Sequence, residues 1–474
     1  MVKPYIISLG IMFGWIAISA IVGVLAYRLK VKVLRLDTYM VAGRRLALLV
    51  VFLNMAAVIY SAFAFLGAAG WTYAYGAPVL YIWAYGPLAY SLAFFFAPRI
   101  WRVAKEHEIL TQPDFFLWRY NSKFLMAFTA LIGIAFNIPY AQLQLLGTKY
   151  IVELGSYFSI PGMWVVVIVY LLVMVYLFLG GMMSLAITNT IQGAIMLVAM
   201  LSMGIIIPIA LFGSHANMFA KLAEVSPAHL VFPGAKGVHP VQWYLSTAIM
   251  CGLGFWCFPQ LAQIIFPAKS PVTVRRSIVL SSWYHLIGFL PVTFVGLAAF
   301  LAFPGLKKAD WALLYSVQKL FPAWVLGLVS AGGIAAALSS VSAIFLTQAS
   351  LLSRNIWQGL IRPKASEREV IWVTRISVIG FILLALYLAW TAPAFLVYLL
   401  LVGYSGITQM FPGWILGTYI KWIKREGVIV GIITGIIIVI LTTFVWKHPF
   451  GIFSGIWGLI PNIVLTLIIS YLKK

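Results

Sequence analysis

The chain has 474 residues, of which 63% are hydrophobic and only 9% are charged. This composition excludes a soluble globular protein of the same length. The formal net charge of +22 is high enough to suggest nucleic-acid binding, but the positions of the basic residues along the chain argue against it.

Thirteen apolar stretches are each close to the roughly 20 residues that an α-helix needs to cross a bilayer. We therefore expect an all-α integral membrane protein with about thirteen transmembrane helices and no soluble domain. The first stretch lacks a small-residue cleavage site, which favours a retained helix over a cleaved signal peptide. The predicted spans are 5–27, 46–70, 77–98, 124–147, 160–179, 184–212, 242–265, 276–303, 321–351, 369–390, 393–418, 427–446 and 450–471.

Lysine and arginine are distributed unevenly between the loops on the two sides of these spans. Alternate segments starting with loop 28–45 hold 23 of the 32 basic residues, the opposite segments hold 8, and Arg375 lies inside a span. The positive-inside rule then predicts an external N-terminus and a cytoplasmic C-terminus. The expected location is the plasma membrane of a prokaryotic cell. The basic residues are thus topological signals that also contact anionic membrane lipids. Nucleic acid is not an expected partner.

The ten carboxylates all lie in loops or at the edges of spans, so none is available for a proton relay inside the membrane. The spans also hold no cluster of carboxylates, histidines or cysteines, which argues against a membrane enzyme and a transition-metal site. A transported cation would have to be held by carbonyl and hydroxyl oxygens. These carboxylates are Asp37, Glu106, Glu108, Asp114, Glu153, Glu224, Asp310, Glu367, Glu369 and Glu426.

Two predicted spans carry residues that interrupt helices. Span 46–70 contains Ser61 and ends in a glycine-rich segment, and span 242–265 contains Gly252, Gly254 and Pro259. These spans begin two successive five-helix units, and an odd number of helices requires the units to insert with opposite orientation. Interrupted helices at matching positions of inverted halves indicate a transporter with its site between them. The expected divisions are 1–45 (first helix and basic loop), 46–212 (first repeat), 213–241 (extracellular loop), 242–418 (second repeat) and 419–474 (two final helices).

Span 321–351 is rich in small residues and carries adjacent hydroxyls at Ser339 and Ser340. The small residues predict close packing against a neighbouring helix. The hydroxyls have two interpretations. They bond back to carbonyls one turn earlier, as serines in apolar helices often do, or they bind a cation.

The segment Ala335-Ala-Ala-Leu-Ser-Ser340 and the motif Gly180-Gly-Met-Met-Ser-Leu-Ala-Ile-Thr-Asn-Thr-Ile-Gln-Gly193 resemble those of the sodium/solute symporter family. The resemblance extends from about residue 40 to 425. It implies a leucine-transporter-like core of inverted five-plus-five helices and Na⁺ as the coupling ion, with no other cofactor. The sodium ligands that it implies are the hydroxyls of Ser339 and Ser340 and the carbonyls of Ala57, Tyr60 and Ala336.

Residues in four other segments bear on the coupling ion or the solute. Many family members have Asp where this chain has Asn189, so we expect one cation per cycle. The second interrupted span resembles that of proline permeases, with Cys251 and Phe255 in place of Trp and Tyr. Sugar-transporting members have polar residues where this chain has Ile59, Phe63 and Ala64, which argues against a sugar because unpaired buried hydroxyls are costly. The segment 96–147 is similar to that of bacterial monocarboxylate permeases.

Together these features predict a sodium:solute symporter that imports a monocarboxylate or small amino acid by alternating access, without an obligate protein partner. Backbone amides around the two glycines of the second interrupted span would receive the carboxylate. The alternatives are proton-coupled transport through His285, uncoupled facilitation, or a channel. Gln144 and Asn54 either join helices or touch solute. The predicted solute-binding residues are Ser61, Phe63, Gly252, Gly254, Phe255 and Pro259.

Overall fold

The protein is described by a computed structural model that covers residues 3–30, 35–392 and 394–473, so the predicted first residue of span 393–418 lies outside it. Over these residues the secondary structure is helical, with one isolated β-bridge between Leu46 and Ala268. The α-helices are α1 (Pro4–Lys30), α2 (Leu36–Val41), α3 (Leu48–Ile59), α4 (Ala68–Tyr75), α5 (Tyr81–Glu106), α6 (Gln112–Tyr120), α7 (Lys123–Gly155), α8 (Gly162–Phe212), α9 (His215–Val225), α10 (Val241–Gly254), α11 (Pro259–Ile265), α12 (Pro271–Ala302), α13 (Ala312–Leu320), α14 (Ala323–Ser350), α15 (Glu367–Thr391), α16 (Leu396–Ile407), α17 (Gly417–Tyr419), α18 (Arg425–Ile440) and α19 (Ser454–Leu472).

Ten helices in the described part of the chain are long and apolar enough to cross a membrane, or twelve when each of two bent pairs counts as one span. Helix α8 has 51 residues, which would make a straight helix about 77 Å long against a hydrocarbon core of about 30 Å. Its backbone instead turns at Gly181, where φ is +53°. A Cβ atom on Gly23 would lie 2.8 Å from Tyr176 and 3.3 Å from Thr188, so the two halves of α8 lie side by side. Counted as two spans, α8 brings the total to the predicted thirteen.

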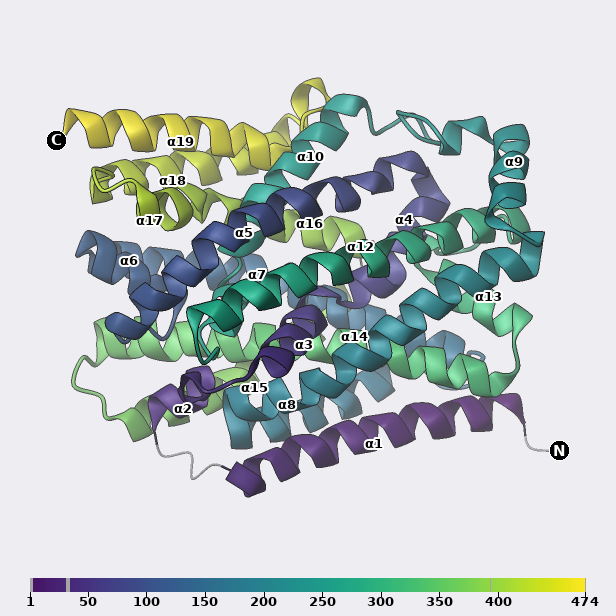
Figure 1. Cartoon of the computed structure of the whole chain (residues 1–474), viewed down its shortest axis with the longest axis horizontal. Helices are drawn as coiled ribbons and strands as arrows, with labels where there is room; N and C mark the ends of the chain where they lie inside the picture. The colour runs from purple at the N-terminus through teal and green to yellow at the C-terminus, as the bar shows by residue number, and fades with distance from the viewer. Residues whose placement is uncertain (1–2, 31–34, 393, 474) are drawn as a thin grey trace.

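The helices form one bundle in which equivalent helices of the two five-helix units make equivalent contacts. The second helix of each unit packs against the broken helix of the other unit: α5 against α10, and α12 against α3 and α4. In the same way, α7 of the first unit packs against α16 of the second, and α14 of the second unit packs against α8 of the first. The two second helices, α5 and α12, also pack against each other. Such exchanged contacts are expected for an inverted repeat. In Figure 1, α1 and the α18–α19 pair lie along opposite edges of this bundle, with α14 in its interior.

Small residues allow α14 to lie in the centre of the bundle. A Cβ atom on Gly332 would come within 2.7 Å of Ala199 on α8, and one on Gly333 within 2.8 Å of Phe65. Phe65 belongs to η2 (Phe63–Gly67), the turn that leads into α4. This close approach, expected for small residues in membrane helices, holds the middle of α14 against the first broken helix.

Candidate functional site

The first broken helix consists of α3, the turn η2 and α4, with a bend of 57°. The helix ends at Tyr60, whose backbone angles (φ −91°, ψ 82°) are not helical. Two polar side chains then satisfy the freed amides. The Ala62 N–H donates to Oε1 of Gln144 at 3.0 Å, and the Phe63 N–H donates to Oγ of Ser61 at 3.1 Å. Gln144 therefore joins helices, and Ser61 caps the segment that follows the break.

Four of the five predicted sodium ligands meet beside this break. The Ser339 hydroxyl donates to the carbonyl oxygens of Ala57 at 2.7 Å and Ala336 at 3.0 Å. The Ser340 hydroxyl lies 3.4 Å from the Ala57 carbonyl and donates at 2.9 Å to that of Val58. Ser339 thus bonds back along its own helix, as the first interpretation expects, and also bonds across to α3. Cation binding by this serine pair stays a prediction.

These oxygens are buried and carry no formal charge. Hydroxyl groups rotate easily, so the same oxygens can turn their lone pairs toward a cation, and carbonyls of unwound helices are common Na⁺ ligands in transporters. Val58 is a further carbonyl that the sequence did not single out. Among the described residues, no hydrogen bond links the Tyr60 carbonyl to either serine. Tyr60 therefore stays a predicted ligand.

An amide cluster adjoins the serine pair. Nδ2 of Asn189 donates to Oδ1 of Asn54 at 2.8 Å and lies 3.5 Å from the Ser339 carbonyl. Oδ1 of Asn189, Nδ2 of Asn54 and both polar atoms of Gln192 are buried without a partner in the described structure. Asn54 is thus linked to the serine helix through Asn189, as a residue that joins helices.

The second broken helix consists of α10, η5 (Phe255–Cys257) and α11, with a bend of 51°. Its break lies at Phe258, whose extended backbone (φ −62°, ψ 122°) precedes Pro259. The freed carbonyls accept hydrogen bonds from N–H groups. The Trp414 indole donates to the Trp256 carbonyl at 2.9 Å, and Gln112 donates to that of Cys257 at 3.0 Å.

The expectation that the helix opens around Gly252 and Gly254 is wrong, because α10 continues through both glycines. A Cβ atom would lie 2.5 Å from Leu88 at Gly252 and 1.9 Å from Thr408 at Gly254. These glycines allow close packing of α10 against neighbouring helices. Their amides belong to a continuous helix and are not free to receive a carboxylate.

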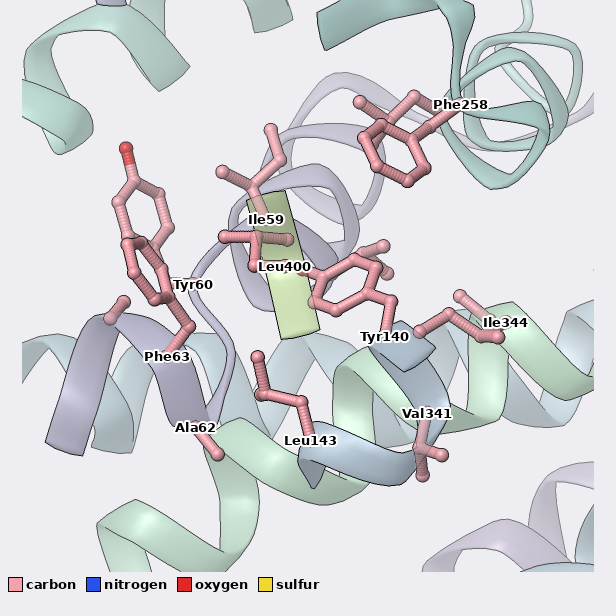
Figure 2. Close-up of a cluster of buried hydrophobic side chains, with 14 of the residues drawn as sticks. Ile59, Tyr60, Ala62, Phe63, Tyr140, Leu143, Phe258, Val341, Ile344 and Leu400 are labelled. Atoms are coloured by element: carbon pink, nitrogen blue, oxygen red, sulfur yellow. The ribbon is translucent and has the colours of Figure 1, made fainter. Parts of the chain in front are cut away.

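A small pocket lies between the two breaks. Of the predicted solute-binding residues, Phe63 and Phe255 line it; Pro259 instead packs against α7, where a Cβ atom on Gly133 would lie 2.8 Å from it. Figure 2 shows the surrounding apolar cluster, in which Ile59, Phe63, Tyr140, Phe258 and Leu400 are labelled. The pocket holds only about 20 Å³ for water-sized spheres, room for about one water molecule. Its lining is Val58, Ile59, Phe63, Tyr85, Tyr140, Phe255, Phe258, Gln260, Leu261, Leu400 and Tyr404.

Several pocket residues escaped the sequence analysis. Gln260 is buried, and its Oε1 has no hydrogen-bond partner within the described part of the chain. Tyr85, Tyr140 and Tyr404 add hydroxyls to an otherwise apolar lining. Each comes from a helix that reads locally as an ordinary apolar span. A glutamine directly after the Pro259 helix breaker was the one available signal.

His285 lies outside this pocket. Its Nε2 donates to the Ile82 carbonyl at 3.0 Å, and its ring centroid lies 6.0 Å from that of Tyr60. Because a carbonyl oxygen can only accept, Nε2 carries a proton, as it does in one neutral tautomer and in the charged imidazolium. His285 thus forms a hydrogen bond between α12 and α5.

The sequence profile of the sodium:solute symporter family matches residues 39–435. The chain belongs to the sodium:solute symporter family. The Bacillus subtilis symporter YhjB is 34% identical over 433 residues, which cover 90% of this chain and 87% of YhjB. Sodium/proline symporter 2 of Staphylococcus saprophyticus is 29% identical and matches 93% of this chain and 88% of its own length.

The fold of this family member agrees with that of a solved transporter. A Na⁺-coupled sialic acid symporter, in a substrate-bound outward-open state, superimposes with a TM-score of 0.82 at 20% identity and covers 98% of both chains. The nucleobase–cation transporter Mhp1 in a closed conformation gives a TM-score of 0.56 at 15% identity, over 92% of this chain and 94% of its own. The similarity confirms the expected leucine-transporter-like architecture.

Proposed function

We propose that this sodium:solute symporter imports a compact monoanion or zwitterion, a monocarboxylate or a small amino acid, together with one Na⁺. Family membership supports sodium-coupled transport in general. The observation that carries the specific proposal is the pairing of Ser339 and Ser340 with the carbonyls of Ala57 and Val58, directly beside a closed pocket.

The pocket lining favours a small solute with few charges. It contains no Lys, Arg, Asp or Glu, so a multiply charged solute would lie in a low dielectric without a charged partner, which is costly. Tyrosine hydroxyls can donate to one carboxylate, and the unpaired Oε1 of Gln260 can accept from an ammonium or amide N–H. Phe63 and Phe255 would contact the apolar part. One of the relatives above is named for proline transport.

Alternating access follows if the two inverted units, proposed as 46–212 and 242–418, move relative to each other around this pocket. The pocket between the two breaks is too small here to hold a solute, as expected for a closed state of the transporter. Opening would separate the second break from the first and enlarge the pocket. The N-terminus is proposed to face the outside and the C-terminus the cytoplasm, as the charge distribution predicts.

Uptake of labelled monocarboxylates and amino acids into proteoliposomes tests the proposal. Candidates are first ranked by the rise in thermal stability that each produces in the purified protein with sodium and with potassium. We expect one compact monoanion or zwitterion to accumulate only with an inward Na⁺ gradient. Strong competition by succinate or glucose would contradict the pocket assignment.

Proton coupling is the second candidate, because His285 is an imidazole within the membrane-spanning helix α12. The same vesicles distinguish it. Accumulation driven by a proton gradient in the absence of sodium would replace the sodium proposal, whereas equilibration without accumulation would identify a facilitator.

A further inference from the structure

A groove outside the central pocket runs along the packed pair α5 and α12. It has a volume of about 410 Å³ and opens to the surface of the protein. Its walls are mostly aromatic and aliphatic, including the exposed side chains of Trp283 and Phe95. Two small residues, Ser91 and Ser282, lie in the walls. Gly86 lets the His285 ring pack closely against α5, because a Cβ atom there would meet the ring at 2.5 Å.

The length of this groove matches one leaflet of a bilayer. On α12 it extends from Ile278 to Leu286, and Arg275 stands one turn before it. The eleven residue-to-residue steps from Arg275 to Leu286 span about 16 Å of helix, close to half of a hydrocarbon core of about 30 Å. The groove therefore reaches from one membrane surface to about the middle of the bilayer, the depth of a single acyl chain.

A positive charge marks the surface end of the groove. Arg275 is exposed, and its guanidinium carbon lies 5.1 Å from the centroid of the Phe94 ring, which lines the groove. No carboxylate among the described residues forms an ion pair with Arg275 or with the adjacent Arg276. Arg275 precedes Val279, Ser282 and Leu286 at helical spacings of four, seven and eleven, so it lies on the groove face of α12.

We propose that this groove binds one anionic phospholipid, with an acyl chain between α5 and α12 and its phosphate at Arg275. The apolar walls match the chain, the open side faces the membrane, and the unpaired guanidinium matches the phosphate. The positive-inside prediction places Arg275 at the cytoplasmic surface, where anionic lipids are concentrated.

Bound lipid would touch the transport machinery through one side chain. His285 lines the deep end of the groove, and its ring packs near that of Tyr60 at the first break. A chain in the groove would therefore support the α5–α12 pair beside the segment that is proposed to bind sodium. The binding test below does not depend on transport activity.

Native mass spectrometry of the purified full chain, titrated with phosphatidylglycerol or with phosphatidylcholine of the same chains, measures this site directly. We expect one retained phosphatidylglycerol and weaker retention of phosphatidylcholine. Arg275→Gln removes the charge and should raise the apparent Kd for phosphatidylglycerol about fivefold. Ser282→Phe fills the groove without changing the charge and should weaken both lipids.

Two matched variants control for surface charge and for bulk. Arg276→Gln removes a neighbouring charge from a different helix face, and Leu280→Phe adds bulk at an exposed position outside the groove. Both should leave the Kd within about twofold of wild type. Equal effects of Arg275→Gln and Arg276→Gln, equal binding of the two lipids, or displacement of the lipid by excess inorganic phosphate would overturn the proposal. Arg275 is exposed, so its variant keeps the test valid if Ser282→Phe does not fold.

Discussion

At the break between α3 and α4 the freed carbonyls accept hydrogen bonds from serine hydroxyls, whereas at the break between α10 and α11 they accept from indole and amide N–H groups. The first arrangement involves Ala57 and Val58 with the serine pair of α14. The second involves Trp256 and Cys257 with Trp414 and Gln112. Both breaks satisfy their backbone groups, as a membrane interior requires.

The two breaks differ in whether their hydrogen-bond donors can also bind a cation. A hydroxyl oxygen can turn away from the carbonyl and offer a lone pair, so a cation can replace its proton between the two oxygens. An indole N–H has no lone pair to offer, and an amide nitrogen is no cation ligand. Inverted halves of similar architecture can thus hold different chemistries, with the proposed cation at the first break and an aromatic wall at the second.

The largest expected effect comes from removing the hydroxyls at the first break. Ser339→Ala and Ser340→Ala should each raise the sodium concentration for half-maximal uptake about tenfold or more, since a lost decade of affinity corresponds to about 1.4 kcal/mol. Ser330→Ala is the matched control, because Ser330 is a buried serine of the same helix whose hydroxyl has no described partner. Full sodium-dependent uptake in the double serine variant would place the cation elsewhere.

Truncating the aromatic wall should separate solute binding from sodium binding. Phe255→Ala removes apolar contact area, and about 56 Å² of lost contact weakens binding by about one decade at 25 cal/mol per Å². We expect a several-fold higher KM for solute with an unchanged sodium dependence, measured by uptake at saturating sodium. A parallel change in sodium dependence would show that the two breaks do not act separately.

Polar caps at the two breaks can be compared by their effect on stability. Gln144→Leu leaves the Ala62 amide without its acceptor, and Trp414→Phe leaves the Trp256 carbonyl without its donor. Each orphaned buried group costs about 1–3 kcal/mol, so both variants should unfold at lower temperature in a thermal-shift assay. Only Gln144→Leu should also alter the sodium dependence. If Trp414→Phe alters it equally, the proposed division of roles is wrong.

The last prediction concerns stability and Asp310, which packs against Gly70 of α4 in the first broken helix. Burial raises the pKa of Asp310 from its ordinary value to about 8, although Lys308 and the Leu396 N–H oppose the shift. Between about pH 4 and pH 8 the folded protein therefore binds more protons here than the unfolded chain, so this group makes stability fall as pH rises. Asp310→Asn should flatten the decline of the melting temperature over that range. An unchanged slope would contradict the shift.

Local features of the sequence were sufficient for the architecture, and with the family resemblance they named four residues that meet beside the first break. Membrane spans are contiguous apolar stretches, so their number could be predicted, even where α8 turns back on itself at Gly181. Ser339 and Ser340 are neighbours with Ala336 one turn away, so this half of the site was visible in one segment. The two broken helices were also identifiable, because glycine, proline and polar residues interrupt an apolar stretch.

Only the tertiary structure decided where the second helix breaks and which groups meet in the pocket. Gly252 and Gly254 do not open α10, because Leu88 and Thr408 from other helices pack against them and hold the helix continuous. The break falls at Phe258, before a proline that lacks an N–H and cannot continue the helical hydrogen-bond ladder. Contacts such as Asn54 with Asn189, 135 residues apart, depend on how separate helices pack against one another, and no local pattern in the chain encodes that packing.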